Sequence, residues 1–400
     1  MEIKHLVIEE EKRNVTPEIG QTYRIKNTRN NQYVRLGMSE TKYLLSVLKR
    51  LDCAEKLNLE GVQELSKELR EKLDEKFEEW GFLDENNTKK KKSAFEKIKK
   101  IHILEFNVQK ILQVVHPIYS KFFSKASLAV LISMILFVIG FFFYGIVLAT
   151  QSTSIKESDF VFQFSAIDVV WIVLYFFINT ILHEFAHAVT CIKYGGKVKS
   201  MGLMLFYFVP CFYCDVSDVY MIDDRKKRAV VAVSGILTNL FIGNVILIIA
   251  IILTYFREPP ILLYYLSIST LVVSIYNFIP FVKLDGYWIV SALSGMDNFM
   301  DKSVIIAYTS IFRRRNLPQI KMKTGKRVLI SLYGLVSLFF HSLFWFYALV
   351  SIQNLLRIEG IWKNATNAFV IFFLVFDITR NLIYYHRLIK EDYDRILMLM

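Results

Sequence analysis

The chain has 400 residues, of which 54% are hydrophobic, 15% are aromatic and 22% are charged, and its formal net charge is +12. These values exclude a disordered chain, and four cysteines in 400 residues exclude a disulfide framework. The hydrophobic excess lies mostly between residues 126 and 383, in runs long enough to cross a bilayer, whereas residues 1–125 are charged. The composition therefore predicts a membrane protein with a soluble N-terminal part.

Membrane topology explains the positive charge better than binding to nucleic acid does. Lys and Arg accumulate in the cytoplasmic loops of membrane proteins. Here they cluster before the first apolar run, in the second and fourth loops, and in the tail. We therefore expect no nucleic-acid partner and a multi-pass protein with both termini in the cytoplasm. The first residues lack an apolar core followed by a cleavage site, so we expect no secretory signal.

Residues 1–87 predict a small α+β domain. In residues 21–37, β-favouring side chains alternate around an Asn–Asn turn, a pattern typical of a hairpin. One helix is expected to follow Ser39, whose side chain can cap it, and a later helix is expected to end at Gly81. Strands followed by helices in fewer than 90 residues favour a winged-helix-like fold.

A basic juxtamembrane linker, residues 88–125, precedes the apolar runs and is expected to lie against an anionic membrane face. A helical crossing needs about 20 apolar residues. The runs predict six transmembrane helices at about 126–150, 169–192, 229–256, 261–284, 328–352 and 364–383. We expect a mainly α-helical membrane domain over residues 126–386, followed by a cytoplasmic tail at 387–400.

The loop after the second predicted span has an unusual composition. Residues 195–213 are apolar at their end, but Gly and Pro interrupt them and they are too few to cross the membrane. Non-helical backbone is tolerated at membrane depth only where protein or a water-filled cavity covers it. We therefore expect a membrane-associated β-hairpin or a re-entrant loop here.

Two histidines and a glutamate lie inside the second predicted span. His183 and His187 are four residues apart, so on a helix both imidazoles can reach one cation, with Glu184 beside the water it binds. Such residues are costly in hydrocarbon and by default mark a functional site. The pattern predicts a zinc site, and an interhelical hydrogen-bond cluster without metal is the alternative.

A catalytic zinc site usually has three protein ligands and a water molecule, so a third ligand is needed. Asp285, at the end of the fourth predicted span, is the candidate. The loop charges orient the second and fourth spans in the same direction, which places Asp285 on the same side as the histidines. Pro280 and Gly286 bracket it and are expected to interrupt the helix. The alternative for Asp285 is an ordinary residue at a helix end.

These motifs resemble those of the site-2 protease family of intramembrane zinc metalloproteases. The similar segments are His183–His187 and Asn277–Gly286, the second of which resembles the family's NxxPxxxLDG signature. The segment Ser234–Asn239 is similar to a further motif of the family but has Ile236 where proline is usual.

A narrower resemblance involves residues 201–218 and 283–298. These segments are similar to peptide zinc metalloproteases found with bacterial genes for ribosomally made, modified peptides and bacteriocins. The resemblance implies a cell-membrane zinc endopeptidase that matures or degrades a peptide substrate. It also relates residues 1–87 to PqqD-like modules, which would bind a leader peptide, for example as an added β-strand.

The expected mechanism follows from these residues. One Zn²⁺ held by His183, His187 and Asp285 would polarise the scissile carbonyl, and Glu184 would act as the general base. Asn277 is a candidate donor to the oxyanion. A non-catalytic alternative is a membrane peptide receptor or immunity protein with a structural metal, but such a closed site gives Glu184 no evident purpose.

Two further signals favour packing over chemistry. Cys211 and Cys214 form a single CxxC pair, for which apolar packing is the favoured interpretation and redox or metal use the alternative. His341 lies in the fifth predicted span, where an interhelical hydrogen bond is favoured over a second metal site.

Overall fold

A computed structural model describes residues 2–3, 6–10, 22–29, 33–50, 65–83, 100–106, 165–206, 209–256, 260–296, 298–312, 323–355 and 360–391, with single residues in 53–62 and 108–117. The fold is mainly helical and includes two small antiparallel sheets. The chain divides into two compact units. The first combines Met1–Glu85 with Ile279–Met400, and the second is Asn86–Phe278.

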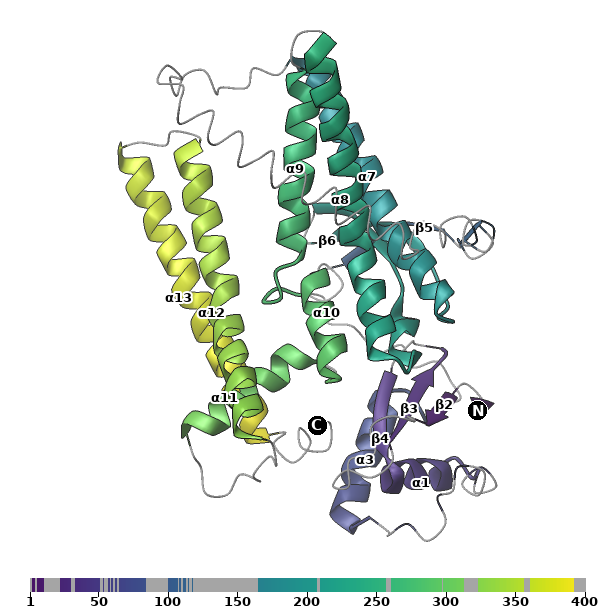
Figure 1. The fold of residues 1–400 in the computed structure, drawn as a ribbon. Helices are drawn as coiled ribbons and strands as arrows, with labels where there is room; N and C mark the ends of the chain where they lie inside the picture. Colours follow the sequence, from purple (N-terminus) through teal and green to yellow (C-terminus); the bar gives the residue numbers. More distant parts are fainter. Residues whose placement is uncertain are drawn as a thin grey trace. The chain divides into compact units, whose positions relative to one another are not determined.

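The N-terminal part of the first unit is a four-stranded antiparallel sheet with helices packed on it (Figure 1). Its elements are β1 (Glu2–Ile3), β2 (Leu6–Glu10), β3 (Thr22–Asn27), β4 (Tyr33–Gly37), α1 (Met38–Val47) and α3 (Lys67–Glu79). The strand order follows the chain, and β3 pairs with β4 from Thr22↔Gly37 to Lys26↔Tyr33. This confirms the hairpin predicted over residues 21–37, whereas β1 and β2 were not predicted.

The core of this part lies between one face of the sheet and the helices. Tyr23 and Ile25 of β3 and Phe77 of α3 are fully buried in it. The end of α3 is tied to the sheet because Asn27 Nδ2 donates to the carbonyl of Gly81, at 2.9 Å. Gly81 has a φ of +67°, as expected for a glycine that ends a helix.

The prediction that Ser39 caps the first helix was wrong. Gly37 occupies the N-cap position and α1 begins at Met38, so Ser39 lies inside the first turn. The reason is that β4 continues into the helix without a loop, and the end of the strand sets where the helix begins.

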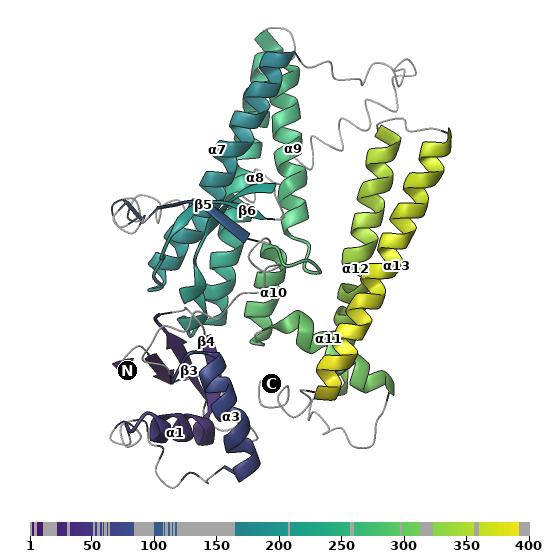
Figure 2. The same cartoon turned by 180° about the vertical axis from the view of Figure 1, so that it is seen from behind.

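The remainder of the first unit is helical and consists of α10 (Asp285–Ser294), α11 (Phe299–Phe312), α12 (Thr324–Leu355) and α13 (Gly360–Glu391). Helices α12 and α13 lie side by side, and α11 lies across one end of the pair (Figures 1 and 2). Helices α11 and α12 approach so closely at Gly334 that a Cβ atom there would overlap the backbone of Ser303.

Three long helices dominate the second unit: α7 (Ala166–Lys193), α8 (Arg225–Phe256) and α9 (Ile261–Asn277). They lie side by side (Figures 1 and 2). Contacts between α7 and α8 pair Asn179 with Asn239 and His187 with Val231, so these two helices are antiparallel. Since α8 and α9 are also antiparallel neighbours joined by a short connection, α7 and α9 run in the same direction.

A three-stranded antiparallel sheet completes the second unit, followed by the short 3-10 helix η2 (Ser217–Met221). Strands β6 (Met201–Phe206) and β7 (Val209–Cys214) form a hairpin, as predicted for residues 195–213. Strand β5 (Lys100–Phe106) pairs with the other edge of β6, and it lies in the stretch predicted as a linker. The approach of β5 to β6 requires a glycine, because a Cβ atom on Gly202 would overlap the carbonyl oxygen of Leu104.

Three of the described helices are long and apolar enough to cross a membrane: α7, α8 and the Asn364–His386 part of α13. These helices indicate a membrane location.

Helix α9 is apolar but has 17 residues and ends at Asn277, so the predicted span 261–284 is too long at its end. Residues 278–282 are apolar, but Pro280 has no backbone N–H to donate and is unfavourable inside a helix. Helix α12 contains the predicted span 328–352, and residues 126–150 lie outside the described residues. Six crossings therefore stay a prediction.

Candidate metal centre

The histidine pair lies on the inner face of a helix whose outer face is apolar. Helix α7 begins with a capping box in which Ser165 and Asp168 bond each other's backbone. Near its other end His183 and His187 are buried, each with 7% of its surface exposed, whereas Leu182 is 43% exposed. The helix therefore turns its two imidazoles inward against α8 and its apolar side chains outward.

The two imidazoles are close enough to share one ligand. Their Nε2 atoms lie 3.2 Å apart, and the two rings are nearly perpendicular, at 84°. The four-residue spacing produces this arrangement, because side chains at positions i and i+4 of a helix lie one above the other.

A backbone hydrogen bond sets the tautomer of His187. Its Nδ1 lies 2.7 Å from the carbonyl oxygen of Val231 in α8. Because a carbonyl oxygen can only accept, Nδ1 must carry the proton, and in the neutral ring Nε2 is left as the electron-pair donor. Partners of this kind orient the histidines of metal sites. Ser234 Oγ donates to the same carbonyl, at 2.7 Å.

Gly235 of α8 leaves open the space between the two Nε2 atoms. A Cβ atom on this residue would overlap Nε2 of His187 and would lie 2.7 Å from Nε2 of His183. The residue is itself buried in the α7–α8 contact. In the sequence, Gly235 stands out only as part of the Ser234–Asn239 motif, because its contact with the histidines depends on how α8 packs against α7.

An asparagine pair lies one helical turn from these groups. Asn179 precedes His183 by four residues, Asn239 follows Gly235 by four, and Asn179 Nδ2 donates to Asn239 Oδ1 at 3.3 Å. Both asparagines are buried, and Asn179 Oδ1 has no hydrogen-bond partner among the described residues. Asn179 was not predicted as a site residue. The signal was available, since a polar residue inside an apolar helix, one turn before a functional histidine, marks the same face.

Asp285 is the first residue of α10 and follows the break after Asn277 that Pro280 and Gly286 predicted. One carboxylate oxygen of Asp285 and one ring nitrogen from each histidine lie within 4.8 Å of one another, a group that could hold a metal ion. Asn277 is the last residue of α9 and is half-buried, and Glu184 is half-buried on α7. Their roles stay predictions.

Of the cysteines near the site, Cys191 is buried, whereas Cys211 and Cys214 are half-buried. Desolvation and, next, the negative charge of Glu184 raise the pKa of the Cys214 thiol well above its usual value. A protonated thiol is a poor metal ligand and a poor nucleophile, which favours the packing interpretation. Cys191 is fully buried against Gly196. The side chain of His341 lies outside the described residues.

Two curated proteins are similar to this chain over part of its length. The chain is 31% identical over 129 residues to the "Putative peptide zinc metalloprotease protein YydH" of Bacillus subtilis, covering 32% of this chain and 49% of that protein. It is 27% identical over 204 residues to "Zinc metalloprotease MJ0392" of Methanocaldococcus jannaschii, covering 48% and 53%. The chain is distantly homologous to both. It spans about half the length of each, no family model matches it, and no solved structure matches it.

The residues fit the zinc ion that the names of these homologues imply. Zinc binds histidine nitrogen at about 2.0–2.1 Å in tetrahedral geometry, which places two such nitrogens about 3.3–3.4 Å apart. The observed 3.2 Å between the Nε2 atoms matches this spacing. Two imidazoles and a carboxylate are also ligands that zinc accepts, and the missing side chain at Gly235 leaves room beside them.

Proposed function

We propose that the protein is an intramembrane zinc endopeptidase that hydrolyses peptide bonds of a membrane-associated or leader-bearing peptide. One observation carries this proposal. The Nε2 atoms of His183 and His187, on one face of an apolar helix, lie 3.2 Å apart, and Asp285 completes a three-ligand group with them. Homology to zinc metalloproteases supports the same conclusion.

The proposed roles of the side chains follow from their chemistry. A bound zinc ion would supply Lewis acidity for attack of water on a peptide carbonyl. The Glu184 carboxylate takes the proton of the attacking water and delivers it to the leaving amine. Asn277 donates a hydrogen bond to the oxyanion. His187 keeps its Nδ1 proton on the carbonyl of Val231, so its ring does not turn during the reaction.

We propose that the substrate binds in an extended conformation beside β7. A helical peptide hides its carbonyl groups in its own hydrogen bonds, so a substrate segment must unwind before it can be cut. Phe212 of β7 packs on Phe177 of α7, with ring centroids 4.6 Å apart, so this strand lies against the helix that carries the histidines. This contact supports strand addition at β7.

Residues 1–87 are proposed to bind a leader peptide. Strands β1 and β4 are the outer strands of their sheet, and an extended peptide can pair with an outer strand through backbone hydrogen bonds. Binding of a fluorescent leader peptide to the full chain, with and without proline substitutions in the peptide, tests this proposal. Prolines remove backbone donors, so they should weaken binding if it occurs by strand addition.

The Glu184→Gln variant tests the proposed reaction. We expect it to keep its zinc and to lose cleavage, because Gln cannot accept the proton of the water. The measurement is the mass of short peptides encoded beside its gene, co-expressed with wild type or variant. Glu75→Gln, an exposed position on α3, is the matched control and should cleave normally. Cleavage that persists in Glu184→Gln would contradict the proposal, and a wild type that binds zinc but cleaves nothing would favour the receptor alternative.

A further inference from the structure

The backbone directly before Asp285 is not helical. Helix α9 ends at Asn277 and α10 begins at Asp285, and the loop Ile279–Leu284 connects them without a continuous pattern of helical hydrogen bonds. At membrane depth such a segment needs partners for its polar groups. The loop also fixes where α10, and therefore the Asp285 carboxylate, begins.

Helix α12 holds the first half of this loop. The hydroxyl of Tyr333 donates to the carbonyl oxygen of Pro280, at 2.6 Å. The ring of Phe281 packs against the rings of Tyr333 and Phe340, with centroid distances of 5.4 and 5.3 Å. Tyr333 therefore satisfies a loop carbonyl and also forms part of the aromatic contact that holds the loop.

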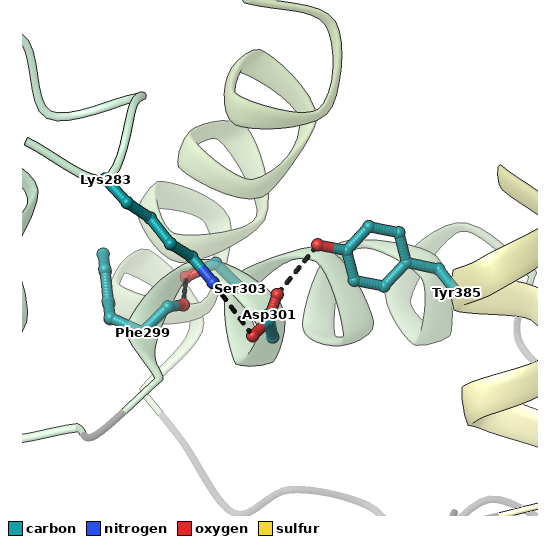
Figure 3. Close-up of polar contacts among 5 residues, drawn as sticks. All are labelled: Lys283, Phe299, Asp301, Ser303 and Tyr385. Carbon is teal, nitrogen blue, oxygen red and sulfur yellow. Dashed lines mark hydrogen bonds and ion pairs between the residues drawn. The ribbon is translucent and has the colours of Figure 1, made fainter. Parts of the chain in front are cut away.

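Helix α11 contacts the second half of the loop through one carboxylate, which α13 also contacts. Asp301, in the first turn of α11, lies between Lys283 of the loop and Tyr385 of α13 (Figure 3). Lys283 Nζ lies 3.7 Å from Asp301 Oδ2, and the Tyr385 hydroxyl donates to Asp301 Oδ1 at 2.9 Å. Ser303 Oγ donates to the carbonyl of Phe299, at 2.6 Å, within the same turn of the helix (Figure 3).

The helix that follows the loop is packed into the same cluster. Tyr287, two residues after Asp285, is 1% exposed and lies in one apolar core with Phe299 of α11 and Ile330 of α12. The loop and the start of α10 are thus held on both sides of Asp285 by the three C-terminal helices.

We propose that helices α11, α12 and α13 position Asp285 for metal binding by holding the loop Ile279–Leu284, with Tyr333 as the principal positioning residue. This inference rests on the proposed function, in which Asp285 is the third zinc ligand. The sequence resemblance involves residues up to about 300, so it assigns nothing to Tyr333 or Tyr385.

The contacts differ in how much they can contribute. Lys283 is 54% exposed and its separation from Asp301 is at the long end for an ion pair, so this pair is weak. The Tyr333 hydroxyl makes a short hydrogen bond to the loop backbone, and its ring adds packing. Removal of the Tyr333 hydroxyl is therefore the change that tests the loop contact most directly.

The test uses the purified full chain and the Tyr333→Phe variant, which keeps the ring and loses only the hydroxyl. Zinc affinity is measured by competition with a chelator, and the absorption spectrum of the cobalt(II) form reports the ligand geometry. We expect zinc affinity to fall by about 10-fold, as for other residues that orient metal ligands, together with a changed cobalt spectrum. Tyr347→Phe, at a position on α12 that is 73% exposed, is the matched control and should resemble wild type.

A double variant distinguishes an effect through Asp285 from a general structural effect. If Tyr333 acts through Asp285, Tyr333→Phe should change the affinity little once Asp285→Ala has removed the carboxylate. A 10-fold loss that persists in that background would overturn the inference, and so would wild-type affinity and spectrum in Tyr333→Phe. Wild type that binds no zinc would instead overturn the proposed function.

Discussion

Gly235 of α8 approaches His187 of α7 so closely that a Cβ atom on the glycine would overlap the Nε2 atom of the imidazole. The backbone of α8 thus forms one wall of the space into which both histidine Nε2 atoms point. The smallest residue is required there because the space it leaves is the space that a shared cation needs.

Replacement of Gly235 with alanine should therefore weaken zinc binding by about 10-fold or more, as for other changes that displace metal ligands. The methyl group must push both rings away from each other or fill the space between them. Zinc content after dialysis against graded free zinc measures the effect. Gly325→Ala on α12, where a Cβ atom meets nothing within 4 Å, is the matched control. Equal zinc content in the two variants would show that Gly235 has no part in the site.

Asn179→Ala should lower the free energy of unfolding by about 0.5–1.5 kcal/mol, the range for hydrogen bonds between membrane helices. The change breaks the 3.3 Å bond to Asn239 and leaves that buried amide without its partner on α7. Denaturant unfolding in detergent is the measurement, with Asn364→Ala at an exposed position of α13 as the control.

A double-variant cycle with Asn239→Ala assigns this effect to the pair. The loss from Asn179→Ala should shrink when Asn239 is already alanine, because the bond is then absent. Losses that simply add would mean that the two asparagines act independently of each other.

The histidine pair and the helix break before Asp285 could be predicted because both depend on local sequence. A four-residue spacing brings His183 and His187 together on any helix. Pro280 lacks a backbone donor and disfavours the helix interior, so a break before Asp285 was predictable. Hydropathy alone, however, could not locate the end of α9 at Asn277, because the residues that follow it are also apolar.

The other features of the site depend on packing between distant segments. Gly235 and Asn179 acquire their roles only where α8 meets α7, and no pattern in either helix alone specifies that contact. Strand β5 was missed for the same reason. It follows a basic stretch, it has a bulge between His102 and Leu104, and its partner strand lies about a hundred residues further along the chain.

The stability of the N-terminal part should fall at alkaline pH. The Tyr43 hydroxyl donates to the Asp74 carboxylate at 2.9 Å, and desolvation, followed by this carboxylate, raises the pKa of Tyr43. In the unfolded chain the phenol ionises near pH 10. As pH rises from about 10 through the higher folded-state pKa, the unfolded state loses its proton first and the free energy of unfolding decreases.

Tyr43→Phe should remove Tyr43's contribution to this pH dependence. Urea titrations at pH 8 and pH 11 measure this contribution. Protease susceptibility reports the unfolding of the N-terminal part at each urea concentration. At pH 8 the variant should be less stable by about 1 kcal/mol through the lost hydrogen bond. Between pH 8 and pH 11 it should lose less stability than wild type. An equal loss in both proteins would contradict the assigned role of Tyr43.

Zinc should stabilise the folded chain. A ligand that binds only the folded state raises the free energy of unfolding by about 2.7 kcal/mol at a concentration 100 times its dissociation constant. The apparent unfolding temperature in detergent should therefore rise with free zinc and fall when a chelator is added. His187→Ala should flatten this response because it removes one of the two facing imidazoles. His386→Ala, an exposed histidine on α13, should respond as wild type does. A zinc response that His187→Ala leaves unchanged would place the stabilising metal at a site other than the His183–His187 pair.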